Sequence, residues 1–326
     1  MIENHRIKFL ALWFLHTFNK RYFAVNFDPV LSCNLRCKMC YFTDENYIKK
    51  LKGSFSKQDL DIWAKQSLPL ALKLQVGCGA EPTVYKHLDK VFELGKQYKV
   101  PHISLTTNAH LLTEEKLTKW LENGLNEITV SMHGVYKDTY EYFMERSNYD
   151  KFHYALQLIS RLKQKYPKLT LRINYTFNED NFEELKDFFE VYSDYSIDII
   201  QLRPISKIGE TAYHNFSLDK IIPLYDDFIN TFRKKCIKKK ISVIAPASKE
   251  NLIQRKNENS IIFNYTYFYV SPTHFWKEGF DWRNVPFRVF AKRIGWGKEL
   301  FLNAFKSKKQ LKHLLRDKNL NYKIDV

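Results

Sequence analysis

The sequence predicts an α/β protein whose strands form a parallel sheet. Two observations carry this prediction. Short apolar runs, often β-branched, alternate with amphipathic runs of helical spacing, and helix start and stop signals fall between them. Six strand-then-helix units in series imply parallel pairing with right-handed crossovers. Periodicity alone leaves two layouts open, a doubly wound sheet and a full or partial barrel. In both layouts, functional groups gather at the carboxyl ends of the strands.

Each unit joins one predicted strand to the helix that follows it. Ser56 and Thr113 are typical N-caps, and Gly124 stands where a C′ glycine belongs. The predicted strands are Phe23–Phe27, Leu72–Val76, His102–Leu105, Glu127–Ser131, Leu169–Thr176 and Ile197–Leu202. The predicted helices are Ser56–Gln66, Val84–Tyr98, Thr113–Asn123, Lys151–Tyr166, Asn181–Tyr192 and Ser217–Lys235.

The two ends of the chain are more basic than its middle. Of the formal net charge of +16, residues 1–21 carry +3 and residues 246–326 carry +9. We therefore expect a basic N-terminal helix over 1–21, the α/β core over 22–245, and a basic, aromatic-rich C-terminal extension over 246–326. The hydrophobic content of 44% excludes a disordered chain. The odd number of five cysteines argues against a secreted disulfide framework, so we expect a reducing, cytoplasmic setting.

The ends also suggest partners. No run reaches the roughly 20 apolar residues that a membrane span needs. The apolar run Ile7–Phe18 predicts a helix over 3–20 that packs on the protein's own core in preference to a membrane surface. The segment Phe275–Phe305 interleaves aromatic and basic side chains. This pattern fits a capping helix, which we favour, peripheral contact with an anionic membrane, or stacking on single-stranded RNA. The run Ile261–Val270 predicts an added strand or a plug.

Three cysteines follow the first predicted strand. Cys33, Cys37 and Cys40 have C-x3-C-x2-C spacing, and such a group of thiolates can bind a soft metal centre. A [4Fe–4S] cluster usually takes four thiolates, so three leave one iron open to a small molecule. Packing of these cysteines on one helix face is disfavoured, because the flanking residues are typical of a loop. Zinc, with Cys78 or a distant His as the fourth ligand, is a further alternative.

The cysteine motif resembles the signature of the radical S-adenosylmethionine (radical SAM) superfamily, with Met39 in place of the usual aromatic residue. The resemblance covers residues 22–210 and implies a partial (β/α)6 TIM-type barrel. It further implies a [4Fe–4S] cluster on the three cysteines, S-adenosylmethionine as cofactor, and a flavodoxin- or ferredoxin-like electron donor. After Cys40 only Cys78 and Cys236 follow. We therefore expect a single-cluster member without a SPASM/twitch auxiliary-cluster domain.

The residues that follow two further predicted strands loosely resemble motifs of the superfamily. Gly77, Gly79 and Glu81 match its Gly-Gly-Glu-Pro motif, which implies that their backbone and carboxylate hold the amino group of S-adenosylmethionine. An ordinary strand-end turn with a surface glutamate is the alternative. Asn108 stands in a Thr-Asn-Ala turn where the superfamily has Thr-Asn-Gly. Alanine in place of glycine makes a positive φ at Ala109 unexpected.

The later strand ends supply candidate anion-binding groups. By resemblance, Ser131 and Arg146 hold the methionine carboxylate, which suits a hydroxyl and a guanidinium. A surface cation is the alternative for Arg146. His133 is expected to touch the ribose or the substrate, or only to fill the barrel mouth. Arg203 is a candidate contact to an anionic substrate, and a structural ion pair is its alternative.

The resemblance implies an enzyme that cleaves S-adenosylmethionine reductively and uses the 5′-deoxyadenosyl radical to abstract hydrogen from a substrate. We rank a glycan, nucleotide-sugar or lipid-linked substrate first, and RNA or peptide modification second. No residue is assigned to catalysis. Asn174 and Asn178 resemble an asparagine-rich stretch of the superfamily. A non-catalytic iron–sulfur or metal-binding protein, and a nucleic-acid- or membrane-binding protein with incidental cysteines, are the competing classes.

Overall fold

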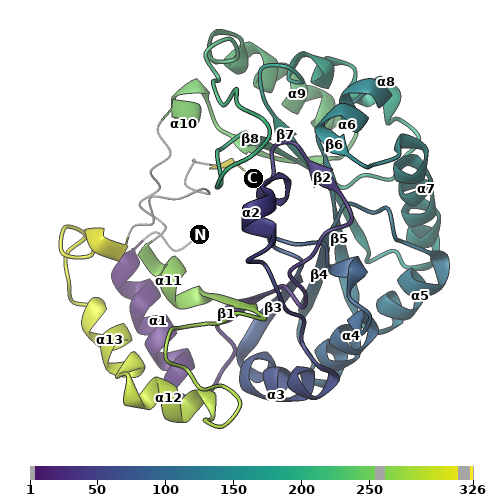
Figure 1. Ribbon diagram of the computed structural model, residues 1–326. Coiled ribbons are helices and arrows are strands. Elements are labelled where there is room, and N and C mark those ends of the chain that lie inside the picture. The colour runs from purple at the N-terminus through teal and green to yellow at the C-terminus, as the bar shows by residue number, and fades with distance from the viewer. Residues whose placement is uncertain (1–3, 254–260, 315–323, 326) are drawn as a thin grey trace.

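One curved sheet of ten strands organises the fold. The structure is a computed structural model that describes residues 4–253, 261–314 and 324–325. The strand order is β11-β10-β1-β3-β4-β5-β7-β8-β9-β12. Neighbours from β10 to β9 run parallel, and β11 and β12 are antiparallel to their partners at the two edges. The predicted partial barrel is confirmed, with helices on its outer side (Figure 1).

All six predicted strands are confirmed, and each observed strand starts and ends within two residues of its predicted bounds. Two parallel strands come in addition. β9 has no counterpart in the prediction, and β10 realises the added-strand alternative for the aromatic run. The strands of the sheet are β1 (Phe23–Phe27), β3 (Ala71–Val76), β4 (His102–Thr107), β5 (Leu125–Met132), β7 (Thr170–Phe177), β8 (Ile199–Pro204), β9 (Ser242–Pro246), β10 (Tyr267–Ser271), β11 (His274–Phe275) and β12 (Ile324–Asp325).

Helices follow most of these strands. The α-helices are α1 (His5–Thr17), α2 (Glu45–Ile48), α3 (Lys57–Ser67), α4 (Leu88–Gln97), α5 (Glu114–Glu122), α6 (Lys137–Phe143), α7 (Tyr149–Lys165), α8 (Phe188–Val191), α9 (Tyr225–Lys238), α10 (Lys249–Ile253), α11 (Phe263–Thr266), α12 (Phe287–Arg293) and α13 (Trp296–Asn303). Ser56 and Thr113 cap α3 and α5 through their hydroxyls, as predicted. No helix among the described residues is long and apolar enough to cross a bilayer.

Three predicted helices are wrong in extent. The helix expected from Val84 begins only at Leu88, because Val84 ends a 3-10 turn that starts at Pro82. The segment expected as one helix over Asn181–Tyr192 divides into a 3-10 turn, Glu183–Lys186, and the short α8. The helix expected from Ser217 begins only at Tyr225, after a 3-10 turn that contains Pro223. A proline ring lacks the N–H of a helix interior, so the regular helix starts beyond it.

Side chains alternate across the sheet. In β1, Phe23, Val25 and Phe27 are buried against the outer helices, and Phe27 stacks on Trp63 of α3 with ring centroids 3.9 Å apart. Burial of such a side chain contributes about 1.5–3 kcal/mol. The intervening positions, such as Asn26, point to the inner face of the sheet. In the central strands this inner face is mostly polar, which sets it apart from the packed layer outside.

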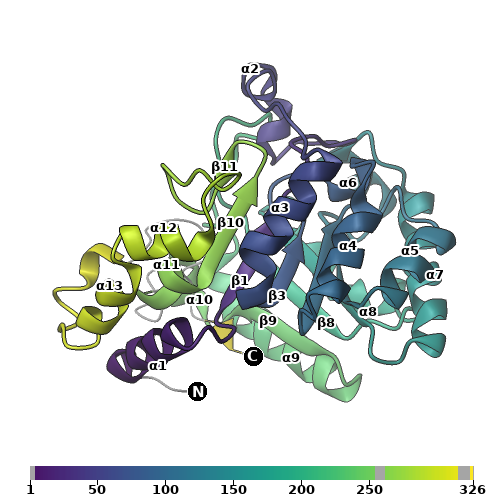
Figure 2. The ribbon, with the colours of Figure 1, turned by 90° about the horizontal axis from the view of Figure 1, so that it is seen from below.

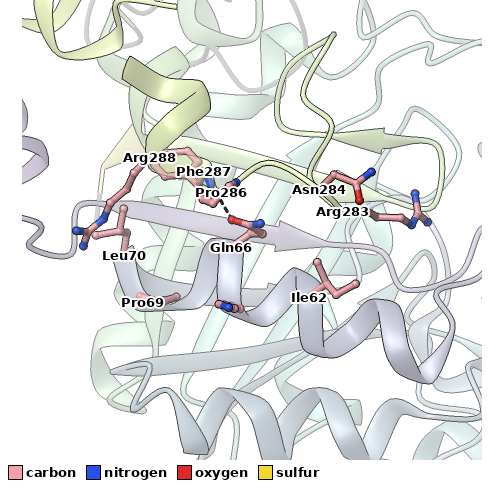
Figure 3. A pocket seen from close by; sticks show the side chains of 10 residues that line it. Ile62, Gln66, Pro69, Leu70, Arg283, Asn284, Pro286, Phe287 and Arg288 are labelled. Carbon is pink, nitrogen blue, oxygen red and sulfur yellow. Dashed lines mark hydrogen bonds between the residues drawn. The ribbon is translucent and has the colours of Figure 1, made fainter. Parts of the chain in front are cut away.

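The C-terminal extension packs on the start of the barrel. β10 pairs with β1. Five aromatic side chains of the extension are buried in the core, which confirms the capping interpretation. They are Trp276, Trp282, Trp296, Phe287 and Phe290. Gln66 of α3 holds the extension on the barrel. The Gln66 Oε1 accepts from the Phe287 backbone N–H at 2.7 Å, beside a surface cavity of about 420 Å³ (Figure 3).

Candidate cluster and cofactor site

The three predicted cysteines lie in the loop between β1 and α2, at the carboxyl end of β1. Part of this loop forms β2 (Arg36–Cys37), which pairs antiparallel with β6 (Met144–Glu145), so Cys37 lies opposite Met144. The Cys40 backbone N–H donates to the Cys37 carbonyl at 2.8 Å and tightens the turn. All three thiols are partly buried. The loop is therefore held by secondary structure on the side of Cys37.

The three thiols share one environment of low polarity. Burial raises the pKa of Cys33 to about 12 and that of Cys37 well above its ordinary value, and there the nearby Cys40 and Cys33 raise it further. Within the described ranges, no group of three His, Cys, Asp or Glu side chains is arranged to hold a metal ion. The zinc alternative therefore has no support in this structure. A cluster spreads its ligands over several irons, so this finding leaves cluster binding a prediction.

Glu81 joins two loops of the site. Its carboxylate is 3% exposed and accepts from the Thr83 N–H at 3.1 Å, the Thr83 hydroxyl at 2.6 Å, the Thr107 hydroxyl at 2.7 Å and the Asn108 N–H at 2.7 Å. Burial raises the pKa of Glu81 despite these donors. These donors hold the Glu81 carboxylate in place, and its contact with the amino group of S-adenosylmethionine stays a prediction. Glu81 positions the loops after β3 and β4.

Asn108 connects this pair of loops to the cysteines. Its side-chain N–H2 donates to Asn34 Oδ1 at 2.9 Å and lies 3.9 Å from the Cys33 sulfur. The following residue, Ala109, has φ +69°, so the expectation of a negative φ is wrong. The Thr107 hydroxyl accepts from the Ala109 N–H at 3.0 Å and holds this turn. The strain is of the order of 1–2 kcal/mol for a residue with a Cβ.

Gly77 and Gly79 are required by close contacts within the protein. Gly77 has φ +84°, and a Cβ there would lie 2.4 Å from the Thr106 carbonyl oxygen. A Cβ on Gly79 would lie 2.6 Å from the Tyr41 hydroxyl, which donates to the Gly79 carbonyl. Tyr41 directly follows Cys40. The glycines thus let the loop after β3 approach the cysteine loop closely.

Asp28, directly after β1, is a site residue that the sequence analysis missed. It is 1% exposed, and its carboxylate accepts from the Cys78 N–H at 2.7 Å, the Gly79 N–H at 3.0 Å and the Tyr269 hydroxyl at 2.9 Å. Burial raises the pKa of Asp28, although these donors lower it. An acidic residue at the carboxyl end of the first predicted strand is the signal that points to it. Asp28 ties β1 to β10 and to the loop after β3.

The turn with Arg146 is also attached to the site. Arg146 follows β6 in the left-handed region at φ +70°, and its side chain is exposed. Two residues on, the Asn148 N–H donates to His110 Nε2 at 2.8 Å, and His110 Nδ1 lies 2.9 Å from the Asn108 carbonyl. The structure therefore brings Arg146 to the same rim as the cysteines and Asn108.

Two buried polar atoms on the inner rim have no partner among the described residues. They are Asn174 Oδ1 on β7 and His133 Nδ1, just beyond β5. Ser131 of β5 lies in register with Asn174. Burial and, to a smaller extent, the charge of Arg203 together lower the pKa of His133 to about 4. Buried polar groups are nearly always hydrogen-bonded, so both atoms are candidate contacts for an ordered water or a polar ligand.

Arg203 extends this rim on β8, in register with Thr176 of β7. The side chain is partly buried, and no carboxylate in the described parts of the chain forms an ion pair with it. Contact of Arg203 with an anionic substrate stays a prediction.

The floor of the inner face lies deeper in the sheet and holds a network of charged side chains, although Arg172 Nε is buried without a partner among the described residues. Glu127 of β5 accepts from Arg172 of β7 at 3.1 Å, and His102 of β4 lies 3.5 Å from the same carboxylate. Burial alone would raise the pKa of Glu127, but His102, Lys73 and Arg172 lower it to about 2. Three basic side chains thus surround a single buried carboxylate.

A cavity of about 340 Å³ adjoins the loop after β3. Two of its lining residues belong to that loop, and the others come from β10 and the residues around β11. They are Cys78, Gly79, Tyr267, Tyr269, His274 and Trp276. The Tyr269 and His274 rings stack, with centroids 5.8 Å apart. Aromatic walls beside polar backbone suit a ring-bearing polar molecule.

Curated relatives of the chain include GTP 3′,8-cyclases. A probable GTP 3′,8-cyclase of Saccharolobus solfataricus is 26% identical over 217 residues, which are 64% of this chain and 65% of that protein. The GTP 3′,8-cyclase of Clostridium botulinum is 26% identical over 204 residues, 60% of this chain and 62% of that protein. The match thus spans less than two thirds of the length of either relative.

Solved structures share the fold. SuiB of Streptococcus suis bound to S-adenosylmethionine matches with a TM-score of 0.59 at 14% identity, over 81% of this chain and 61% of that one. The protein anSMEcpe with bound AdoMet and the Cp18Cys peptide matches with a TM-score of 0.58 at 15% identity, over 88% and 84%. At these identities the likeness establishes the fold alone.

A family model described as the radical SAM superfamily matches residues 29–191, half of the chain. This range contains the cysteine loop, the loops after β3 and β4, and the turn with Arg146. The resemblance recognised in the sequence is thereby confirmed. The chain belongs to the radical SAM superfamily, whose enzymes bind a [4Fe–4S] cluster and S-adenosylmethionine and draw on an electron donor.

Proposed function

We propose that Cys33, Cys37 and Cys40 bind the [4Fe–4S] cluster and that the enzyme acts on a phosphorylated sugar compound of the nucleotide or nucleotide-sugar class. The observation that carries the substrate class is the cationic, polar inner face of the sheet, with Arg203 free of any carboxylate partner among the described residues. When bound, the cluster and S-adenosylmethionine supply a radical that abstracts hydrogen. The chain's own residues bind, orient and shield the reactants.

The residues present fit the cluster. Three half-buried thiols stand in one loop, and Asn108 Nδ2 approaches the Cys33 sulfur at 3.9 Å, as an N–H group that tunes a cluster ligand does. Met39 lies between the last two cysteines, and its sulfur is 3.2 Å from Asn178 Nδ2. This contact fixes the inner side of the loop against β7. The cysteine loop is thus supported before any cluster is bound.

The residues present also fit S-adenosylmethionine. The backbone of Gly77–Gly79 lies beside the cysteine loop, and Asp28 and Glu81 hold that backbone in place. We assign the carboxylate of the cofactor to Ser131 and Arg146, which border the same rim. The unpaired Asn174 Oδ1 next to Ser131 is an acceptor for a polar group of the cofactor or substrate.

The substrate class follows from charge and shape. Lys73 and Arg172 lie on the floor, Arg203 lies on the rim, and Glu127 is the carboxylate that the floor cations share. The field on the inner face is therefore positive and favours phosphate. The aromatic cavity beside Gly79 suits a sugar or base ring. The names of the curated relatives, GTP 3′,8-cyclases, agree with a nucleotide.

Peptide modification is the second candidate, because anSMEcpe is also known with a bound peptide. Against it stands the cysteine count. After Cys40 the chain holds only Cys78 and Cys236, too few for the auxiliary cluster that many peptide-modifying relatives carry. For the electron donor we propose a flavodoxin- or ferredoxin-like protein. It would approach the cluster site over the exposed rim around Arg146.

Anaerobic reconstitution with iron and sulfide tests the cluster assignment. We expect a brown protein that releases 5′-deoxyadenosine from S-adenosylmethionine under dithionite. Cys37→Ala should lose colour and cleavage together. Cys236→Ala, in a buried position of α9, is the matched control and should retain both. Turnover by Cys37→Ala would contradict the assignment.

The substrate is tested by stimulation of 5′-deoxyadenosine release. Nucleotides and nucleotide sugars should increase the release and acquire a product of changed mass. A precursor-like peptide and a single-stranded RNA serve as comparators. If only the peptide or only the RNA is consumed, the substrate proposal fails while the cluster assignment stands.

A further inference from the structure

Helix α1 is apolar on two opposite faces. One face packs inside the protein, where Phe9 and Leu12 are buried and Phe9 meets Tyr265 edge-on with centroids 5.3 Å apart. The opposite face carries Ile7, Leu10, Phe14 and Phe18, with exposed fractions of 51%, 39%, 51% and 55%. Their spacing of three and four residues places them along one stripe. The preference for core packing stated from the sequence therefore accounts for only one face.

Helix α13 continues this exposed surface. Phe301 packs on Trp13 of α1 with ring centroids 5.1 Å apart and on Phe305 at the same distance. Phe301 is 38% and Phe305 64% exposed. Phe14 and Phe18 also contact each other, at 4.5 Å. We define the terminal apolar patch as Ile7, Leu10, Phe14, Phe18, Phe301 and Phe305.

The segments that carry the terminal apolar patch are rich in cations. Residues 4–21 contain four Lys or Arg and no acidic residue. Residues 286–314 contain eight, with Glu299 as the single acid, and Glu299 accepts from the Tyr265 hydroxyl at 2.5 Å within the protein. On α12, Lys292 and Arg293 are exposed. The elements that form the patch therefore carry a strong excess of positive charge.

A helix with apolar side chains on two opposite faces ordinarily has both of them covered, and here the protein covers only one. α1 has 13 residues, fewer than the roughly 20 that span a bilayer, so it can only lie in the interface. A second copy of the chain would bring like charges together. RNA would satisfy the cations but leave Ile7 and Leu10 in water, because aliphatic side chains offer no stacking surface.

We propose that the terminal apolar patch docks the enzyme on an anionic bilayer surface, with the apolar side chains among the acyl chains and the cations at the headgroups. This inference goes beyond the proposed function and does not depend on it. Figure 2 shows α1 at the opposite end of the barrel from α2, which follows the cysteine loop. Docking through α1 therefore leaves the cluster site open to an electron donor.

Flotation of the reconstituted full-length protein tests the proposal. Vesicles of phosphatidylcholine alone are compared with vesicles that also contain phosphatidylglycerol. We expect binding to the anionic vesicles, weakened by salt as surface electrostatics are screened. The double variant Phe14→Ser/Phe18→Ser should lower the partition coefficient about tenfold or more, since each ring buried in an apolar phase is worth a factor of that order. Release of 5′-deoxyadenosine from soluble S-adenosylmethionine should be unchanged and reports folding.

Matched variants separate the two components of binding. Ile237→Ser removes an apolar side chain that is 74% exposed on α9, away from the patch, and should float like the wild type. Lys292→Glu/Arg293→Glu should weaken binding to anionic vesicles and keep the apolar stripe intact. Absence of wild-type flotation, or unchanged flotation of Phe14→Ser/Phe18→Ser, overturns the proposal. If the protein retards an RNA oligonucleotide on a gel but does not float with vesicles, the surface binds nucleic acid and the proposal is overturned.

Discussion

The floor and the rim of the inner sheet face contrast in how their polar groups are satisfied. On the floor, the Glu127 carboxylate is shared by Arg172, His102 and Lys73. On the rim, Asn174 Oδ1 and His133 Nδ1 are buried without a partner in the described chain. The floor network stabilises the fold through its charge pairs, although Arg172 Nε is also buried without a partner among the described residues. The rim differs in its position, because it lies at the carboxyl ends of the strands, where enzymes with parallel α/β sheets bind their ligands.

The largest expected effect lies on the floor. Glu127→Gln leaves Arg172 and Lys73 without their carboxylate and should lower the free energy of unfolding by about 3–5 kcal/mol, as loss of one partner of a buried pair does. Urea denaturation measures it. Arg161→Gln breaks the exposed pair with Glu114 and should cost at most about 1 kcal/mol. If both variants lowered the free energy of unfolding by the same amount, the distinction between floor and surface would be lost.

Glu81 lies between the two cases, because it is buried on the rim yet fully hydrogen-bonded. Glu81→Gln replaces an acceptor of the Thr107 and Asn108 donors by an amide, and should cost about 1–3 kcal/mol in unfolding free energy. As a positioning residue it should also raise the KM for S-adenosylmethionine and leave kcat nearly intact. Glu122→Gln, at an exposed position of α5, is the control. A fall in kcat alone would assign Glu81 a contact with the reacting groups.

Arg203 tests the rim directly. Arg203→Gln should raise the KM for the phosphorylated substrate about tenfold or more, the usual worth of a hydrogen bond to a charged group. The unfolding free energy should hardly change, since the described chain offers this cation no carboxylate. Steady-state kinetics and urea denaturation together measure both effects. A large loss of stability with an unchanged KM would return Arg203 to a structural role.

The smallest expected effect is a pH dependence at His133. The folded pKa of about 4 lies below the ordinary 6.5, so the unfolded chain binds the extra proton first. The contribution of neutral His133 is therefore complete above pH 6.5 and is lost as the pH falls from 6.5 toward 4. His133→Gln should flatten the stability profile in that window. Identical profiles for the two proteins would show that His133 is not desolvated in solution.

Much of the site could be predicted from the sequence, because strand ends of a parallel sheet meet at one edge. Cys33 follows β1 and Asn108 follows β4, and the structure brings these two side chains to within 3.9 Å of each other, as this rule predicts. The part of Ser131, near the end of β5, stays a prediction. Asp28 was missed although its place at the end of the first predicted strand is a signal. Its partners Cys78 and Tyr269 are distant in sequence, so the sequence alone does not show which groups it binds.

The errors in the fold have local physical causes. The division of the segment over Asn181–Tyr192 follows from Asn181, whose side chain is used by the loop after β7 and by the His133 carbonyl at 3.0 Å. Ala109 adopts the left-handed region in a turn held by the hydrogen bond from its N–H to the Thr107 hydroxyl, which outweighs its own preference. Propensity describes the isolated residue, and both exceptions lie at the site.

The pairing of β10 with β1 has a consequence for the order of folding. β1 is synthesised well before β10, and the strand that pairs with its outer edge ends only at Ser271. Until then that edge exposes unpaired backbone donors and acceptors, which invites association with other nascent chains. Translation speed and chaperone supply should therefore limit the yield of this protein more strongly than its final stability does.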